Sequence, residues 1–79
     1  MKIKILGPGC KNCHKLENQV SDALKELEMQ ADVEKIEDME SIMEHDVFMT
    51  PGLVINDKVK VSGRVPKGDE IKKWIKEEQ

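Results

Sequence analysis

The sequence predicts an α/β fold in which four strands form a mixed sheet and three helices pack on it, in the order βαβαββα. Three observations lead to this prediction. Apolar residues recur at helical spacing in three separate segments. Strand-like segments precede and follow the first of these, which implies two parallel strands joined by a right-handed crossover. Asn56 and Asp57, between two short apolar runs, indicate an antiparallel hairpin. With 79 residues, we expect a single domain spanning 1–79.

The first strand is predicted over residues 2–6, where lysine alternates with isoleucine. Ile3 and Ile5 then share one face, and Lys2 and Lys4 share the other. A central strand paired in parallel is normally apolar on both faces. The lysines therefore indicate that one face of this strand is only partly covered.

The first helix is predicted from about Lys11 to Met29. Extending its apolar stripe backwards by three residues from Leu16 reaches Cys13, whereas Cys10 lies at or before the first turn. We therefore expect Cys13 to face inward and Cys10 to face outward. The stripe itself consists of Leu16, Val20, Ala23, Leu24 and Leu27.

Five further elements follow the first helix. They are a strand at 31–36, a short helix at 37–45, strands at 53–55 and 59–61, and a helix from 67–69 to about 76. At the start of the last helix, Asp69 is the first candidate for the N-cap and Gly68 is the second.

Several side chains in these elements are expected to serve packing. Trp74 is expected to anchor the last helix in the core. His14 and His45 lie among charged residues and are expected to be solvated, with metal ligation as the alternative. Gly63 indicates a turn, or else a close backbone approach near the site. Four methionines are expected to pack in the core and not to bind copper: Met29, Met39, Met43 and Met49.

Composition excludes some classes of function. The net charge is −3 and no basic face accompanies the lysines, which argues against nucleic acid as a partner. No apolar run reaches the length of a membrane span or of a signal peptide's core, so we expect a cytoplasmic protein. In a reducing compartment, a lone cysteine pair is typical of catalysis or metal binding and not of a structural crosslink.

The two cysteines lie three residues apart in the segment Gly7–Cys13, where the first strand gives way to the first helix. Cys10 would be the attacking nucleophile, because the positive end of the helix and the neighbouring Lys11 favour its thiolate and so lower its pKa. Lys11 and Asn12, between the cysteines, are the residues expected to tune this reactivity. Cys13 would be the resolving thiol, which attacks the mixed disulfide and releases the reduced substrate.

Two other uses of the cysteine pair remain open at this point. Cys10 and Cys13 could act as small apolar core residues, although a Gly/Pro turn is a poor place for packing. The loop also resembles the soft-metal loop of heavy-metal-associated domains, and two thiolates suit Cu(I) or Zn(II). Those domains run βαββαβ and end in a strand, whereas this chain ends in a helix. The order of elements therefore favours redox chemistry, with a copper or zinc chaperone as the alternative.

Three features in combination resemble the thioredoxin fold. These are the Cys10–Cys13 motif after the first strand, Thr50-Pro51 directly before a hairpin, and a closing helix. The chain is most similar to small, glutaredoxin-sized thioredoxin-like proteins of archaea and bacteria with a Gly-x-Gly-Cys-x-x-Cys site, and the resemblance covers essentially the whole chain. It implies that Pro51 is a cis-proline facing the disulfide. Thr50 and Pro51 would then shape a groove in which the Thr50 backbone pairs with an extended substrate.

The resemblance also implies an activity and partners. The protein would be a thiol–disulfide oxidoreductase that exchanges with protein disulfides and is recycled by a flavin-dependent thioredoxin reductase. It would carry electrons in cell redox homeostasis as a monomer, without a prosthetic group or metal. The chain departs from thioredoxins proper in having Gly9 before the first cysteine and Lys-Asn between the two. Lys2 and Lys4 also leave the first strand without an acidic residue to accept a proton.

Overall fold

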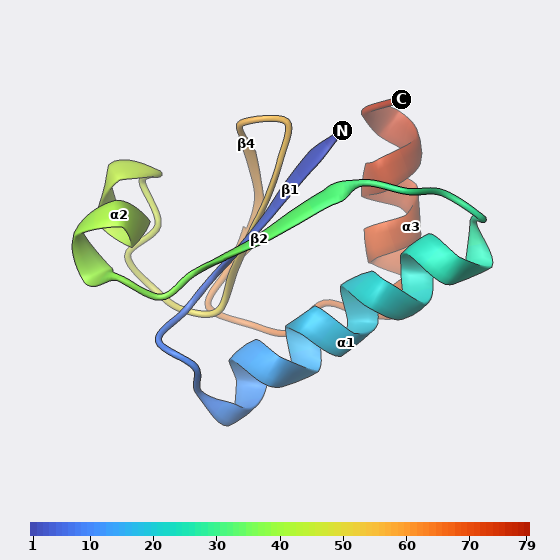
Figure 1. The fold of residues 1–79 in the computed structure, drawn as a ribbon. Helices are drawn as coiled ribbons and strands as arrows, with labels where there is room; N and C mark the ends of the chain where they lie inside the picture. The colour runs from blue at the N-terminus through green and yellow to red at the C-terminus, as the bar shows by residue number, and fades with distance from the viewer.

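The computed structural model describes all residues from 1 to 79. Its strands form one mixed sheet in the order β2-β1-β3-β4, in which β1 pairs parallel with β2 and antiparallel with β3, and β3 pairs antiparallel with β4 (Figure 1). The predicted fold class and order of elements are thereby confirmed. The elements are β1 (Lys2–Leu6), α1 (Lys11–Glu26), β2 (Asp32–Ile36), α2 (Met39–Glu44), β3 (Gly52–Ile55), β4 (Lys58–Ser62) and α3 (Gly68–Glu77).

The helices divide between the two faces of the sheet (Figure 1). α1 and α3 pack on one face over the main core, and α2 packs on the other face over a smaller cluster. The smaller cluster consists of Leu6, Ile42, Val47 and Val54. The main cluster consists of Ile3, Ile5, Leu16, Val20, Ala23, Leu24, Leu53, Ile55, Val61, Ile71 and Ile75.

α1 forms as its apolar stripe predicts, and its five buried residues are Cys13, Leu16, Val20, Ala23 and Leu24. The helix ends earlier than expected, because Glu28 adopts a left-handed conformation with φ of 54°. No helix of the chain has the length and apolar content that crossing a membrane requires.

The partly covered face of β1 lies under α2. Lys2 is exposed and Lys4 is half-buried, as the alternating lysines indicated. Lys4 Nζ lies 3.1 Å from Nε2 of His45, whose Nδ1 lies 2.8 Å from the carbonyl oxygen of Ser41. The expectation of a solvated His45 is therefore wrong. The ring is half-buried at the end of α2, in contact with Lys4 of β1 and the carbonyl oxygen of Ser41. His14 is exposed, as expected.

The hairpin turn between β3 and β4 has left-handed backbone at both Asn56 and Asp57, with φ of 49° and 67°. This is the conformation that a two-residue hairpin requires. The predicted N-cap of α3 is wrong. Lys67 occupies that position without a side-chain hydrogen bond, and Asp69 lies inside the first turn. There the Asp69 carboxylate pairs with Lys72 at 3.3 Å.

The methionines correct the expected core. Met29 packs against the main cluster, but Met39, Met43 and Met49 are 54%, 52% and 66% exposed. α2 is only six residues long and buries Ile42 alone, so its two methionines flank the contact with the sheet. Trp74 packs against the main core, as expected of an anchor of the last helix, although its side chain is only partly buried.

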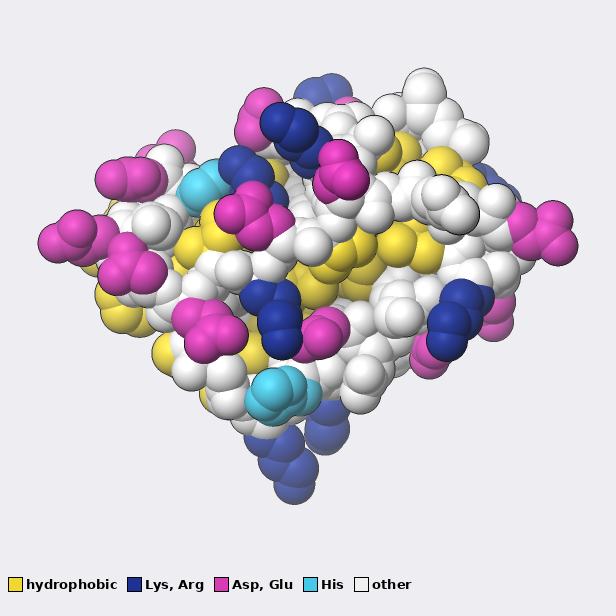
Figure 2. Space-filling model, in the orientation of Figure 1, with side chains coloured by type: hydrophobic (Ala, Val, Ile, Leu, Met, Phe, Trp, Pro, Cys, Tyr) yellow, Lys and Arg dark blue, Asp and Glu magenta, His cyan; other side chains and the backbone are white.

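Charged side chains gather in different parts of the surface. Acidic side chains cluster over α2, and lysine and histidine side chains lie at the end of the molecule where α1 begins (Figure 2). Hydrophobic side chains are exposed across the middle of the same face (Figure 2).

Candidate active site

Cys10 and Cys13 form a disulfide at the N-terminus of α1, with their Cα atoms 5.0 Å apart. Cys10 is the N-cap residue and is exposed, whereas Cys13 is only 5% exposed. The backbone N–H of Cys13 donates a hydrogen bond to Sγ of Cys10 at 3.3 Å. The predicted inequality of the two cysteines is therefore confirmed, with one sulfur presented outward and the other sheltered.

The first turn of α1 contains no acidic residue of its own. Lys11 and Asn12 are both exposed beside Cys10, where the sequence placed them. Positive charge and free backbone N–H groups at a helix N-terminus stabilise a thiolate. This turn therefore has the electrostatics that suit an attacking sulfur at Cys10.

Gly7 is the point at which the other parts of the site meet the disulfide. A Cβ atom on Gly7 would collide with Sγ of Cys13 and would lie 3.8 Å from Cβ of Thr50. The backbone N–H of Gly7 donates to the carbonyl oxygen of Ile36 at the end of β2, at 2.9 Å. The absence of a side chain at Gly7 thus lets Cys13, Thr50 and the end of β2 approach one another.

The segment before β3 forms the side of the site next to Thr50. The Thr50–Pro51 peptide bond is cis, and Pro51 is buried while Thr50 is half-buried. The Pro51 carbonyl accepts a hydrogen bond of 2.9 Å from the N–H of Gly63, which has φ of 87°. A Cβ on Gly63 would lie 3.2 Å from Cβ of Met49, so the Met49 side chain packs on this glycine. Gly63 therefore marks a close backbone approach at the site.

Two apolar side chains that precede Pro51 in the sequence are exposed, which the sequence did not predict. Phe48 is 74% exposed and Met49 is 66% exposed, whereas the preceding Val47 is fully buried. The apolar run of residues 47–49 could have predicted this exposure. Three consecutive side chains just before a strand point in different directions, so they cannot all be buried in one core.

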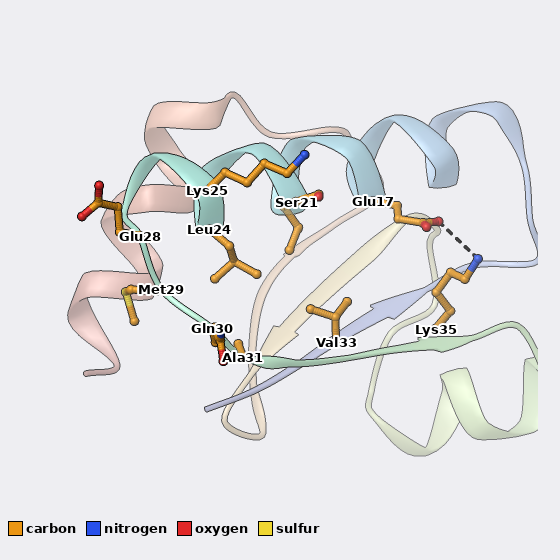
Figure 3. A pocket seen from close by; sticks show the side chains of 11 residues that line it. Glu17, Ser21, Leu24, Lys25, Glu28, Met29, Gln30, Ala31, Val33 and Lys35 are labelled. Carbon is orange, nitrogen blue, oxygen red and sulfur yellow. Dashed lines mark ion pairs between the residues drawn. The ribbon is translucent and has the colours of Figure 1, made fainter.

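A broad groove of about 820 Å³ lies between α1 and β2 and is separate from the disulfide (Figure 3). Leu24, Met29 and Val33 form part of its apolar lining. At one end, Glu17 of α1 and Lys35 of β2 form an ion pair of 3.4 Å across it (Figure 3).

The sequence offered metal binding as the alternative use of the cysteines. No group of three or more His, Cys, Asp or Glu side chains is arranged to hold a metal ion.

Comparison with known proteins agrees with this geometry. A family model described as "Thioredoxin domain" matches residues 1–76. A thioredoxin of Methanothermobacter thermautotrophicus is 45% identical over 75 residues, which cover 95% of this chain and 97% of that protein. A thioredoxin of Methanocaldococcus jannaschii is 36% identical over 74 residues, which cover 94% of this chain and 85% of that protein. On the strength of its fold, its disulfide and these matches, the chain belongs to the thioredoxin family.

Proposed function

We propose that this protein is a single-domain thiol–disulfide oxidoreductase that reduces protein disulfides. The observation that carries the proposal is the unequal exposure of Cys10 and Cys13 at the start of α1. A thiol that attacks a bulky substrate needs access, and a thiol that completes the reaction within the same protein does not.

The reaction follows from these two positions. The thiolate of Cys10 attacks one sulfur of the substrate disulfide, forms a Cys10–substrate disulfide and releases the other substrate sulfur as a thiol. Cys13 then attacks Sγ of Cys10, which breaks the mixed disulfide and releases the second substrate thiol. The substrate gains two electrons and two protons, and this protein is left with the Cys10–Cys13 disulfide. Lys11, Asn12 and the helix N-terminus favour the thiolate of Cys10 in the first step.

Thr50 and Pro51 are proposed to form the substrate groove. Neither the N–H nor the C=O of Thr50 makes a backbone hydrogen bond within the chain, so both can pair with an extended segment of substrate. The exposed side chains of Phe48 and Met49 extend this surface with apolar area. A disulfide flanked by apolar residues in a locally extended segment is the substrate that this surface suits.

The source of electrons is proposed to be a flavin-dependent thioredoxin reductase in the cytoplasm. The protein itself then needs no prosthetic group, because its cysteine pair carries both electrons between reductase and substrate. A monomer suffices for this role, since Cys10, Cys13 and Thr50 come from the same chain.

Trapping of the mixed disulfide tests the roles of the two cysteines. Cys13→Ser should accumulate a covalent complex with a disulfide-containing protein such as insulin, whereas Cys10→Ser should not, because its remaining thiol is sheltered. The Cys10→Ser/Cys13→Ser double variant is the matched control. Trapping of equal efficiency in both single variants would contradict the assignment.

Turnover tests the function itself. The wild-type protein should reduce insulin with NADPH and thioredoxin reductase, and replacement of either cysteine should abolish turnover. Tight Cu(I) or Zn(II) binding by the reduced protein, together with no turnover, would favour the metal chaperone instead.

A further inference from the structure

The resolving step must dispose of a proton, and this requirement rests on the function proposed above. Cys13 attacks as a thiolate, so its thiol proton must leave when the new sulfur–sulfur bond forms. A free thiol has a pKa of about 8.5, and most of it is therefore protonated at neutral pH. A group that accepts this proton near Cys13 would accelerate the step.

The interior of the protein contains no such group. No polar or charged side chain is buried anywhere in the chain. Lys2 and Lys4 alternate with the isoleucines of β1, so the strand that leads into the site has no carboxylate. Cys13 is itself only 5% exposed, which limits its direct contact with solvent. The proton must therefore leave through an opening in the wall around Cys13.

A narrow crevice of about 20 Å³ provides that opening. Cys13, Gly7 and Gly9 contribute to its wall, together with side chains from α1 and from the end of β2. A space of roughly 10–15 Å³ or more can hold one water molecule when polar groups line it. The crevice thus has room for a single water between the Cys13 sulfur and a side chain at its rim.

Four titratable side chains lie at this rim: His14, Glu17, Lys35 and Glu37. Glu17 pairs with Lys35 at 3.4 Å, so its carboxylate already has a cationic partner. His14 follows Cys13 directly in α1, and its side chain therefore leaves the helix about 100° away from that of Cys13. Glu37 is the acidic residue at this rim that forms no ion pair.

The backbone brings Glu37 to the crevice. The N–H of Gly7 donates to the carbonyl of Ile36, the residue before Glu37, and Gly7 is the residue on which Sγ of Cys13 packs. On the other side, Oε2 of Glu37 lies 3.9 Å from the position that a Cβ of Gly9 would take. The exposed carboxylate therefore lies over the glycine loop, and it lines the same crevice as Cys13.

We propose that Glu37 accepts the proton of Cys13 through one water molecule in this crevice. In the step, the Cys13 thiol gives its proton to the water, which passes one to the Glu37 carboxylate. The sulfur electron pair forms the bond to Sγ of Cys10, and the bond between Cys10 and the substrate breaks. The substrate sulfur leaves with the electron pair of the broken bond, and the protonated Glu37 returns the proton to the departing thiolate or to solvent.

Stopped-flow reaction of the reduced protein with 5,5′-dithiobis(2-nitrobenzoate) separates the two steps. The first release of thionitrobenzoate reports attack by Cys10 and depends on reagent concentration. The second reports attack by Cys13 within the protein and is independent of concentration. In Glu37→Gln the first phase should be unchanged, and the second should slow about a hundredfold at pH 7, the lower range for lost general-base catalysis. The defect should shrink above about pH 8.5, where the thiol ionises without help.

Two matched variants serve as controls. Glu17→Gln removes the same charge from the same crevice, and His14→Gln removes the imidazole, which could also accept a proton. Both variants should keep the rate of the second phase within about twofold of the wild type. An unchanged second phase in Glu37→Gln would overturn the proposal, as would an equal slowing in Glu17→Gln or a loss confined to His14→Gln. A defect that did not depend on pH would also overturn it, since that would indicate altered structure. If the wild type shows no concentration-independent second phase, the proposed function fails instead.

Discussion

Gly7→Ala perturbs the contact that brings the disulfide, β2 and Thr50 together. A Cβ at this position would collide with Sγ of Cys13 and lie 3.2 Å from Cys13 Cβ. In the oxidised protein that sulfur is bonded to Cys10 and cannot turn away. Gly7 is buried, so the added methyl group cannot move into solvent either.

The expected cost follows from overpacking. An extra methyl group in a well-packed interior costs about 1–3 kcal/mol of stability, and the collision with a fixed sulfur favours the upper part of that range. In a domain of this size, 1 kcal/mol corresponds to roughly 4–8 °C, so a loss of about 2 kcal/mol lowers Tm by roughly 8–16 °C. The loss should be smaller in the reduced protein, because the free Cys13 side chain can change rotamer.

Thermal and urea unfolding of both redox states measure this effect. Gly68→Ala is the matched control, because a Cβ there would lie 3.5 Å from Oε1 of Gln19, an ordinary contact. Replacing that glycine at the start of α3 should raise stability by about 0.4–1 kcal/mol through lower entropy of the unfolded chain. Oxidised Gly7→Ala with wild-type stability would refute the packing argument, as would an equal loss in both variants.

Three further predictions concern reactivity, pH and the core. Alkylation of the reduced protein should modify Cys10 at a lower pH than a free thiol, and a rate profile that matches a free thiol would contradict activation by the helix. The pKa of Glu78 lies below its ordinary value because Lys60 donates a hydrogen bond to its carboxylate. Because this pKa is lower in the folded protein than the value of 4.5 in the unfolded chain, the ionised Glu78 stabilises the folded protein above about pH 4.5. This stabilisation is lost as the pH falls below that value. Glu78→Gln should therefore lower Tm at pH 7, and the difference from wild type should vanish in acid; a constant difference would exclude this ion pair as the cause. Ile71→Ala should cost about 2–5 kcal/mol in urea unfolding, because its side chain is fully buried in the main core; a loss below about 1 kcal/mol would contradict that packing.

Prediction from the sequence was most accurate where the signal is local. The spacing of Leu16, Val20 and Leu24 defines one face of α1, and this face alone separates Cys13 from Cys10. The left-handed turn at Asn56 and Asp57 likewise depends on a few adjacent residues. Both features depend on backbone periodicity or on local conformation, which a single segment contains.

Prediction failed where the neighbours are distant in sequence. Met39, Met43 and Met49 have the apolar character of core residues, but α2 is too short to bury more than Ile42. His45 lies in a charged segment, yet the packing of α2 on β1 places it against Lys4. Hydropathy indicates which residues can be buried. It does not indicate how much of a helix surface is covered by the sheet on which the helix packs.

The sequence by itself determined the order of the elements, the parallel crossover and the unequal placement of the two cysteines. Tertiary structure decided what surrounds the disulfide. Gly7 lets Thr50 approach Cys13, the end of β2 brings Glu37 to the crevice, and Phe48 is left on the surface. These arrangements depend on strand register and on the close approach of separate backbones, neither of which is encoded in the periodicity of one segment.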